Sequence, residues 1–491
     1  MYPAGTRRRL LLAGASAIAA AACGRSGADS AGPTHRWLPP TRLELWLGGI
    51  AAPVEHVIRT IVLPTFRARY PAVRVTIAGV PPAGQSSTTN RAPASWGLIA
   101  PGQPVGGNPS VFGSSGGRLN GGSSLSLRGP TADGDAFNRL IADHAAGISA
   151  DIIPAGTGNI SSVRHLRAAR ILDHRDFLDD LRRDFVGDAV SQLATDSGPL
   201  GVPWLANPRR YVWRTDTLSA IGAHVPESWE DVVQTCVRTS AGRPRTVGRR
   251  LLAINGLHLE FYEALRQRDV SAIEYGKAAF AGEEGIAIAR YFADRGQTDT
   301  IGRYGSGTTW GSDLGGQGVA GAWTTLSGLM RVIGSSAHGT SPLRIGQPIG
   351  AGGVTYQADA PAKGAIATHA WWFVSKSTSV PDSAWALLRA IVEPDAMLAV
   401  AQAAWQVPTR RSAGRRGFLA DPLVQQFVRP YLDDGLAAPA LPAHVEMEPI
   451  LLNRLNAIAR GELNPTAALR EAARQWDDAI SKAGHPDEPR H

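Results

Sequence analysis

Cysteine is nearly absent from this sequence, with only Cys23 and Cys236 among 491 residues. So few thiols exclude a small scaffold held together by disulfides. Charged residues make up 19% of the chain, and its formal charge of +8 is scattered without a long basic run, which argues against nucleic-acid binding. After the N-terminus, no apolar run of about 18 residues occurs, so no internal segment is expected to span a membrane.

The sequence also lacks the short motifs of common enzymes. It contains no GxSxG elbow, no HExxH helix, no P-loop lysine sequence and no Cys/His metal spacing. The glycines of Gly305–Gly318 do not follow a strand and open a helix, as a dinucleotide fingerprint would. The acidic pairs Asp179-Asp180 and Glu283-Glu284 are neighbours on predicted helices and therefore point about 100° apart. We expect no catalytic residue, cofactor or metal, although carboxylates from distant segments could converge in a secreted glycosidase.

The N-terminus carries an export signal. Three arginines, Arg7 to Arg9, precede an apolar run from Leu10 to Ala22, which is typical of a secretory signal peptide over residues 1–22. The three alanines before Cys23 resemble a bacterial lipoprotein box, with Ala20 where leucine is usual. We expect Cys23 to be lipidated and residues 23–41 to tether the protein to the outer face of the bacterial cytoplasmic membrane. A plain secretory signal is the alternative, and twin-arginine export stays open.

The length of the mature chain is sufficient for two lobes. Strand patterns at 42–47 and 73–80 flank a helical pattern over Pro53–Tyr70. This βαβ order predicts a parallel sheet, with ligand sites at the carboxyl ends of its strands. Residues 82–134 are dominated by Gly, Ser, Pro, Asn and Thr, so we expect a flexible insertion, with a functional lid as the alternative.

Further elements are predicted along the rest of the chain. Ser228 is placed as the N-cap of a helix that covers Pro226–Thr235. The remaining strand and helix patterns lie at Ala150–Pro154, Gly198–Trp204, Arg210–Trp213, Ala370–Ser375, Pro381–Val392 and 446–482.

The ordered series of these segments resembles the family-1 extracellular solute-binding proteins of ABC importers, a sugar-binding group with maltodextrin- and glycerol-phosphate-binding members. The best match is GPLGVPWLANPRRYVWRTDTLSAIGAHVPESWEDV at 198–232. FRARYPAVRVTI, GQGVAGAWTTLSG and HAWWFVSKSTSVPDSAWALLRAI match other family segments. The resemblance covers most of residues 42–482 outside the insertion, and Ala150 and Ala322 depart from the family pattern.

The resemblance implies an α/β fold of the type II periplasmic-binding-protein kind, with two hinged lobes and a ligand cleft between them. Lobe 1 would comprise 42–204 and 347–402, and lobe 2 would comprise 205–346 and 403–485. The hinge crossings are expected near Trp204–Pro208, Gly346–Gly350 and Gln402–Val407. The implied partners of this monomer are a sugar or polyol ligand and the permease subunits of an ABC importer.

Tryptophan is the most informative residue type for the site, because sugars bind flat aromatic rings through their C–H faces. We expect two or three of the tryptophans at strand ends and loop edges to face the ligand, with Trp204 and Trp323 as first choices. Neighbouring residues on a strand point to opposite faces, so only one of the adjacent pair at 371–372 can do so. The six candidates are Trp46, Trp204, Trp323, Trp371, Trp372 and Trp405.

Polar side chains and glycines complete the predicted site. They lie at strand ends, hinge crossings and turns, where the glycines would let a ligand approach the backbone. Gly352 and Gly353 could instead form a turn, and Arg410 could be a solvated charge. The full set is Gly48, Gly156, Thr157, Asn207, Arg209, Thr324, Gly352, Gly353 and Arg410.

These observations favour an extracytoplasmic protein that captures a carbohydrate or related polyol for import. A secreted carbohydrate-active hydrolase and a ligand-presenting sensor subunit are the alternatives. The ligand stays open among mono-, di- and oligosaccharides and a glycerophosphodiester, for which Arg209 and Arg410 would supply positive charge.

Overall fold

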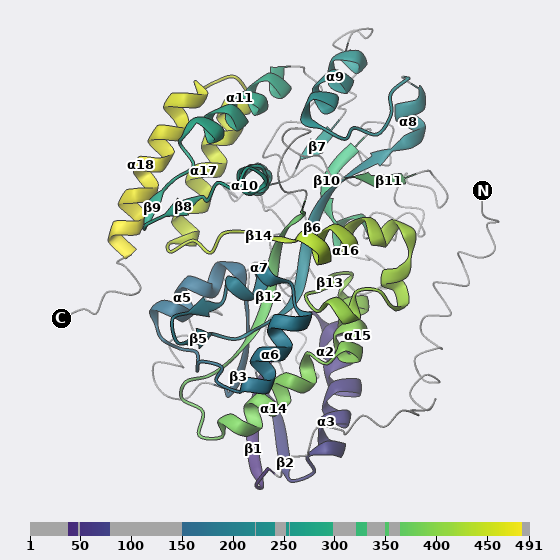
Figure 1. Ribbon diagram of the computed structural model, residues 1–491, viewed down its shortest axis with the longest axis vertical. Coiled ribbons are helices and arrows are strands. Elements are labelled where there is room, and N and C mark those ends of the chain that lie inside the picture. Colours follow the sequence, from purple (N-terminus) through teal and green to yellow (C-terminus); the bar gives the residue numbers. More distant parts are fainter. Residues whose placement is uncertain are drawn as a thin grey trace, which may run out of the picture.

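The computed structural model describes residues 38–47, 50–78, 150–220, 222–240, 252–254, 256–297, 321–330, 349–352 and 364–483 (Figure 1). The predictions for the signal peptide, Cys23, Gly48, Gly353 and the insertion at 82–134 lie outside these residues. The described part forms two lobes of strands and helices along the long axis of the molecule, with the strands β6 and β12 running between them (Figure 1).

The first lobe begins with the predicted βαβ unit. β1 (Thr41–Trp46) pairs in parallel with β2 (Val73–Ala78) and β3 (Ile152–Gly156), which confirms the parallel sheet. The crossover helix has three consecutive parts, α2 (Ala52–Val57), the π-helical η1 (Ile58–Val62) and α3 (Leu63–Arg69). Every residue of β3 is buried, because both faces of the sheet are covered.

Helices from distant parts of the chain cover this sheet. Trp372 and Trp371 are neighbours on β12 and point into the apolar clusters on its two faces. The covering elements are α5 (Ile160–His165), α6 (Arg175–Asp184), α7 (Gly187–Ser191), α14 (Pro381–Ile391) and α15 (Pro394–Ala404), with the short strands β4 (Ala194–Thr195) and β5 (Gly198–Pro199) beside them.

One long strand connects the lobes. The sequence predicts two strands at 198–204 and 210–213, whereas the structure has a single strand, β6 (Val202–Arg214), buried at every position. Its first half pairs with β12 (Ile366–Val374), and its second half pairs with β10 (Gly321–Thr325) and β11 (Ile349–Gly352). Partners on both sides keep the strand continuous through Pro203 and Pro208.

The second lobe packs helices around the far end of β6. The N-cap prediction is confirmed, because Ser228 Oγ accepts from Asp231 N at 3.1 Å while Asp231 Oδ2 accepts from Ser228 N. The elements are β7 (Leu252–Ile254), the hairpin β8 (Ile273–Glu274) and β9 (Lys277–Ala278), α8 (Thr215–Ala220), α9 (Trp229–Ser240), α10 (Leu257–Gln267), α11 (Glu283–Gln297), α17 (His444–Ala459) and α18 (Pro465–Ala483).

The segment from β13 (Val407–Pro408) to β14 (Leu436–Ala437) lies between the lobes. It includes the 3-10 turns η4 (Arg411–Ala413) and η5 (Gly417–Ala420) and the helix α16 (Pro422–Asp434). β13 pairs with the first half of β6, and β11 pairs with its second half. The lobe boundaries expected at 347 and 403 stay a prediction.

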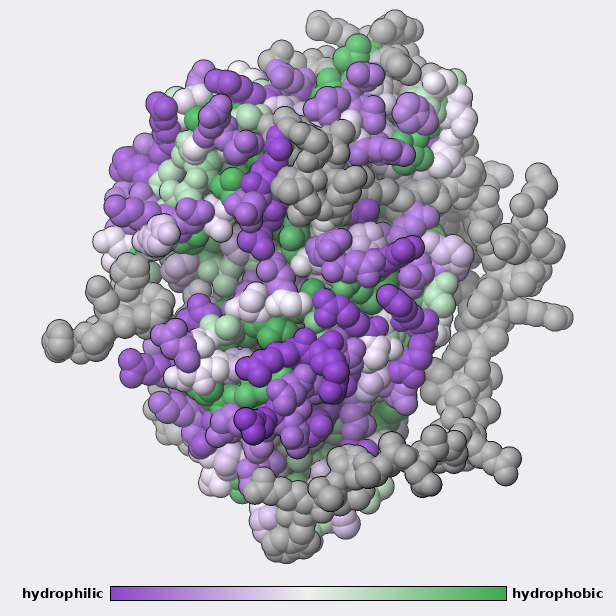
Figure 2. Space-filling model, viewed as in Figure 1, coloured by the Kyte–Doolittle hydropathy of each residue, from purple (hydrophilic) through white to green (hydrophobic). Residues whose placement is uncertain are grey.

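The described surface on one face is mostly hydrophilic, with small hydrophobic patches (Figure 2). Among the described residues, no helix combines the length and apolar character needed to cross a membrane.

Candidate functional site

A small cavity lies where three elements of the two lobes meet. From the first lobe comes η3 (Thr157–Asn159), which directly follows the carboxyl end of β3. The starts of α10 and α17 face it from the second lobe, and α10 begins after Gly256, whose φ of +85° favours glycine. The cavity of about 20 Å³ holds one water-sized group. Its lining is Thr157, Gly158, His258, Leu259, Tyr262, Thr368, Ala438, Pro439, Leu441, His444 and Glu448.

Two imidazoles hold one carboxylate in the wall of this cavity. The Nε2 atoms of His258 and His444 each lie 2.7 Å from a different oxygen of Glu448. These imidazoles outweigh burial and hold the pKa of Glu448 well below its ordinary value. An ionised carboxylate only accepts hydrogen bonds, so both Nε2 atoms carry protons.

Three polar atoms around the cavity are buried without a hydrogen-bond partner in the described part of the chain. They are the hydroxyl oxygen of Tyr262 and the Nδ1 atoms of His258 and His444. Burial raises the pKa of Tyr262 well above its ordinary value, so its phenol is neutral. Leaving such groups unpaired costs about 1–3 kcal/mol each, and a ligand that pairs them recovers part of this energy.

Thr157 joins the cavity to the connecting strand β12. Its Oγ1 accepts from His369 N at 2.8 Å, and His369 Nε2 lies 2.9 Å from the hydroxyl of Tyr431. Burial lowers the pKa of His369 to about 3, so this histidine is neutral. Thr157 is thus the predicted site residue that lines the cavity, whereas the backbone of Gly156 is used by the fold, where it accepts from Trp371 Nε1 and donates to the side chain of Asn159.

A second group of predicted residues lies on β6 and β10. The guanidinium carbon of Arg209 lies 4.8 Å from the ring centre of Trp323. Burial lowers the pKa of Arg209 to about 10, so it stays protonated at neutral pH. Asn207 Oδ1 accepts from the hydroxyl of Ser327, and the Thr324 hydroxyl donates to the carbonyl of Thr325.

The six predicted tryptophans pack against protein. Trp204 and Trp372 contact each other at 5.0 Å inside the first lobe, and Trp371 lies on the opposite face of the sheet. Trp46 is partly buried against the cluster around Trp371. At the end of α15, Trp405 adopts a left-handed φ of +52° and contacts Phe418. The described lining of the cavity contains none of them.

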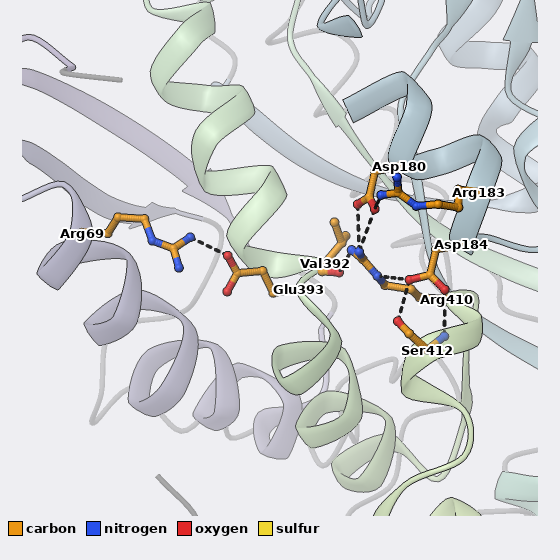
Figure 3. A network of polar contacts seen from close by, with 8 residues as sticks. All are labelled: Arg69, Asp180, Arg183, Asp184, Val392, Glu393, Arg410 and Ser412. Carbon is orange, nitrogen blue, oxygen red and sulfur yellow. Dashed lines mark hydrogen bonds and ion pairs between the residues drawn. The ribbon is translucent and has the colours of Figure 1, made fainter. Parts of the chain in front are cut away.

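Arg410 lies in an ion-pair network of the first lobe rather than at the cavity (Figure 3). Its Nε donates to Asp184 at 2.7 Å, its Nη2 donates to Asp180 at 3.0 Å, and its Nη1 donates to the carbonyl of Val392 at 3.0 Å. Ser412 also donates to Asp184 through both its backbone N–H and its hydroxyl. The donors of Arg410 are thus used to join α6 to the segment after β13.

The described chain also has a larger hollow of about 290 Å³ beside α16. It is lined mainly by exposed charged side chains, among them Arg415, Arg429 and Asp433. No cluster of three or more His, Cys, Asp or Glu side chains suited to a metal occurs in the described residues. In the cavity itself, both Nε2 atoms point at the carboxylate of Glu448.

Sequence reasoning missed the residues of the second lobe that line the cavity. His258 and Tyr262 lie in the first two turns of α10, and His444 and Glu448 lie in the first two turns of α17. The spacing of His444 and Glu448 on a predicted helix places them on one face, which is a signal that the sequence offered. Local sequence patterns did not predict that α10 and α17 would pack against η3.

A family model for bacterial extracellular solute-binding proteins matches residues 128–426. The chain belongs to this family. Membership of the extracellular solute-binding family places the protein outside the cytoplasm. A search of curated proteins found no significant match.

Solved structures of solute-binding proteins share the two-lobe fold. The sugar-binding protein MalE from Xanthomonas citri superposes with a TM-score of 0.68 at 16% identity, over 90% of this chain and 98% of that chain. The cyclic alpha-maltosyl-1,6-maltose binding protein from Arthrobacter globiformis gives 0.66 at 15% identity, over 91% and 100%. A solute-binding protein from Thermotoga lettingae bound with alpha-D-tagatose gives 0.59 at 14% identity, over 90% and 100%. At these identities the likeness establishes the fold of this solute-binding protein.

Proposed function

We propose that this solute-binding protein captures a neutral carbohydrate or polyol in the cleft between its lobes and delivers it, chemically unchanged, to an ABC importer. The observation that carries the proposal is the cavity between η3, α10 and α17, which has room for one hydroxyl group of a larger ligand and where buried polar atoms have no partner among the described residues. The structural neighbours described above bind sugars, which supports the same ligand class.

The chemistry of the cavity favours hydroxyl groups. The Glu448 carboxylate has lone pairs beyond those used by the two imidazoles, and the hydroxyls of Tyr262 and Thr157 both donate and accept. A sugar hydroxyl can do the same and can therefore satisfy several of these atoms at once. The ionised carboxylate of Glu448 would repel an anionic group. We therefore propose a neutral sugar as the ligand rather than a glycerophosphodiester.

Closure of the lobes is the proposed mode of capture. β6 and β12 connect the lobes, and a ligand that contacts both η3 and α17 binds the closed form more tightly than the open one. The shift toward closure then equals the difference in binding free energy between the two forms. Arg209 and Trp323, which contact each other on β6 and β10, are proposed as further ligand contacts.

A binding panel tests the proposal. The full secreted chain is titrated with maltose, maltotetraose, tagatose and glycerol 3-phosphate, and intrinsic tryptophan fluorescence and the thermal unfolding midpoint are recorded. We expect saturable binding of at least one neutral sugar, no binding of glycerol 3-phosphate, and quantitative recovery of the unchanged sugar by chromatography. Hydrolysis of the sugar would favour the glycosidase alternative instead.

The lipid anchor belongs to the same proposal, since capture is useful only close to the importer. We infer that Cys23 carries the lipid and that the chain is held at the outer face of the membrane. The Cys23→Ala variant is expected to leave the membrane fraction and lose incorporation of labelled palmitate. Retention of both in the variant would point to a different form of attachment.

A further inference from the structure

We propose that Gln406 is a ligand-binding residue in the floor of the cleft and that it contacts a second ring of the sugar, so that the preferred ligand is at least a disaccharide. The proposal rests on the proposed function, because it defines the ligand of the same cleft. Gln406 follows α15 and directly precedes β13. Its side chain is fully buried, yet neither its amide nitrogen nor its amide oxygen has a hydrogen-bond partner among the described residues. A buried amide is costly unless something pairs with it.

On one face of the connecting strands, the apolar core is interrupted. Alternate residues of a strand share a face, so Leu205 and Tyr211 of β6 lie on the same face. Leu205 belongs to the apolar cluster of the first lobe, and Tyr211 belongs to that of the second lobe. On the opposite face, Ala206 and Val212 belong to one common cluster. The core is therefore divided between the lobes only on the face of Leu205 and Tyr211, and this face forms the floor of the cleft.

A polar band lies at this interruption. We use this name for Asn207 and Arg209 of β6, Thr325 of β10 and Thr368 of β12. Thr368 pairs with Asn207, and Thr325 pairs with Arg209, so all four side chains share the face of the cleft floor. Thr368 also lines the cavity described above. The polar band thus extends the cavity across the strands that connect the lobes.

Backbone contacts place Gln406 beside the polar band. β12 and β13 pair with opposite edges of β6, and Val407 of β13 lies opposite Ala206. The residue before Val407 is therefore next to Asn207, and side-chain alternation directs it away from the cluster that contains Val407. The backbone N–H of Gln406 donates to the carbonyl of Ala401 at 3.1 Å, which fixes its backbone at the end of α15.

The amide of Gln406 suits a pair of neighbouring hydroxyl groups. Its nitrogen donates two hydrogen bonds and its oxygen accepts them. A sugar ring presents adjacent hydroxyls that donate and accept in the same way. The amide oxygen of Asn207, by contrast, already accepts from the hydroxyl of Ser327. Gln406 is therefore the amide beside the polar band that gains most from a ligand.

The position of Gln406 also sets the length of the ligand. Thr368 and Gln406 lie on opposite sides of β6, so two strand spacings, about 10 Å, separate their backbones. A single sugar ring with one hydroxyl in the cavity does not reach across this distance. A second linked ring does, and it would lie over Asn207 and Gln406.

The variant Gln406→Met tests the contact, because it replaces the amide with an apolar side chain of similar size. The full secreted chain is titrated calorimetrically with maltose, cellobiose and maltotetraose, and with the single rings glucose and tagatose. We expect the wild type to prefer an oligosaccharide. In the variant, the Kd of that oligosaccharide should rise about 10-fold, while the Kd of a single ring stays the same.

The outcomes separate this inference from the proposed function. A wild type that binds only single rings, or a variant that binds the oligosaccharide as tightly as the wild type, would overturn the role of Gln406 and leave sugar capture intact. Absence of binding to all five sugars would instead overturn the proposed function.

Thermal unfolding of the free proteins distinguishes a ligand contact from a structural role. The unfolding midpoint of Gln406→Met should be unchanged or higher, because an unpaired buried amide is removed. Gln425→Met is the matched control, since the Gln425 amide donates to the carbonyls of Gly414 and Leu419. The control should lower the midpoint and keep the affinity for sugar. A midpoint that falls as far in Gln406→Met as in Gln425→Met would assign the Gln406 amide to the structure and overturn the proposal.

Discussion

The molecule contains two charged clusters that differ in how completely their polar atoms are paired. In the first lobe, Arg410 donates to two aspartates and a backbone carbonyl through Nε and both terminal nitrogens. In the cleft, Glu448 is held by two histidines whose remaining nitrogens have no partner among the described residues. Both clusters combine buried charges from distant segments, so burial and charge alone do not separate a structural network from a binding site.

The difference in pairing does separate them. A network whose groups are all satisfied gains nothing from a ligand and serves to join elements, here α6 to the segment after β13. Unpaired polar atoms that face a cavity leave energy that a ligand can recover. The variants below test this comparison, from the largest expected effect to the smallest.

Arg410→Met should lower the free energy of unfolding by about 2 kcal/mol, because Asp180 and Asp184 lose their shared ion-pair partner and keep only Arg183 and Ser412. The affinity for sugar should change little, since the network lies away from the cleft. Urea unfolding measures the first quantity and fluorescence titration the second. Arg429→Met is the control, because the Arg429–Asp433 pair is exposed and should contribute less than 1 kcal/mol. Equal losses in both variants would contradict the structural role of Arg410.

Glu263 tests an intermediate case, a buried carboxylate near the connecting strands. Burial raises its pKa to about 8, and its carboxylate accepts from Gln267 and from the backbone N–H of Ile366. The folded form therefore binds a proton more tightly than the unfolded form, and stability falls as pH rises from about 4.5 to 8. We expect the ionisation of Glu263 to lower the free energy of unfolding by about 2 kcal/mol between pH 5 and pH 7.

The Glu263→Gln variant should lose that part of the pH dependence and gain stability relative to the wild type as pH rises. Unfolding midpoints at pH 5, 6, 7 and 8 measure the trend. Glu274→Gln, at an exposed position of the β8–β9 hairpin, should follow the wild-type curve. Parallel curves for all three proteins would mean that Glu263 is ionised in the folded state.

A matched pair of tyrosines gives the smallest and most specific effects. Tyr262→Phe removes a buried hydroxyl that has no partner in the described residues, so stability should be unchanged or slightly higher. Its affinity for sugar should fall about 3- to 10-fold. Tyr431→Phe removes the partner of His369 and should cost about 1 kcal/mol of stability while affinity is kept. A loss of stability in Tyr262→Phe together with a loss of affinity in Tyr431→Phe would contradict these assignments.

Much of the fold was predictable because local patterns determine it. The alternation at 42–47 and 73–80 and the helix between them predicted the parallel pair β1–β2. Ser228 is the expected N-cap of α9, and the structure adds the reciprocal bond from Ser228 N to Asp231. The single strand β6 was not predictable, because its continuity through Pro203 and Pro208 depends on partners that come from 321–325, 349–352 and 366–374.

The positions of the candidate site residues were harder to predict, for the same reason. Thr157 follows a strand end, and in the structure it lines the cavity. Tryptophans such as Trp204 and Trp371 were expected to face the ligand, but in this structure they fill the two faces of the first-lobe sheet. Large aromatic rings stabilise a core as effectively as they bind sugars, so their position in the sequence does not distinguish the two uses.

Hydrogen–deuterium exchange with and without the sugar that binds tests the central claim most directly, because it reports both clusters in one experiment. The account predicts slower exchange in the presence of sugar in peptides that cover 157–159, 257–262 and 444–448. Exchange in peptides that cover 180–184 and 410–412 should be unchanged. Protection confined to the Arg410 network, or absent from both η3 and the start of α17 despite saturation, would contradict the placement of the ligand between the lobes.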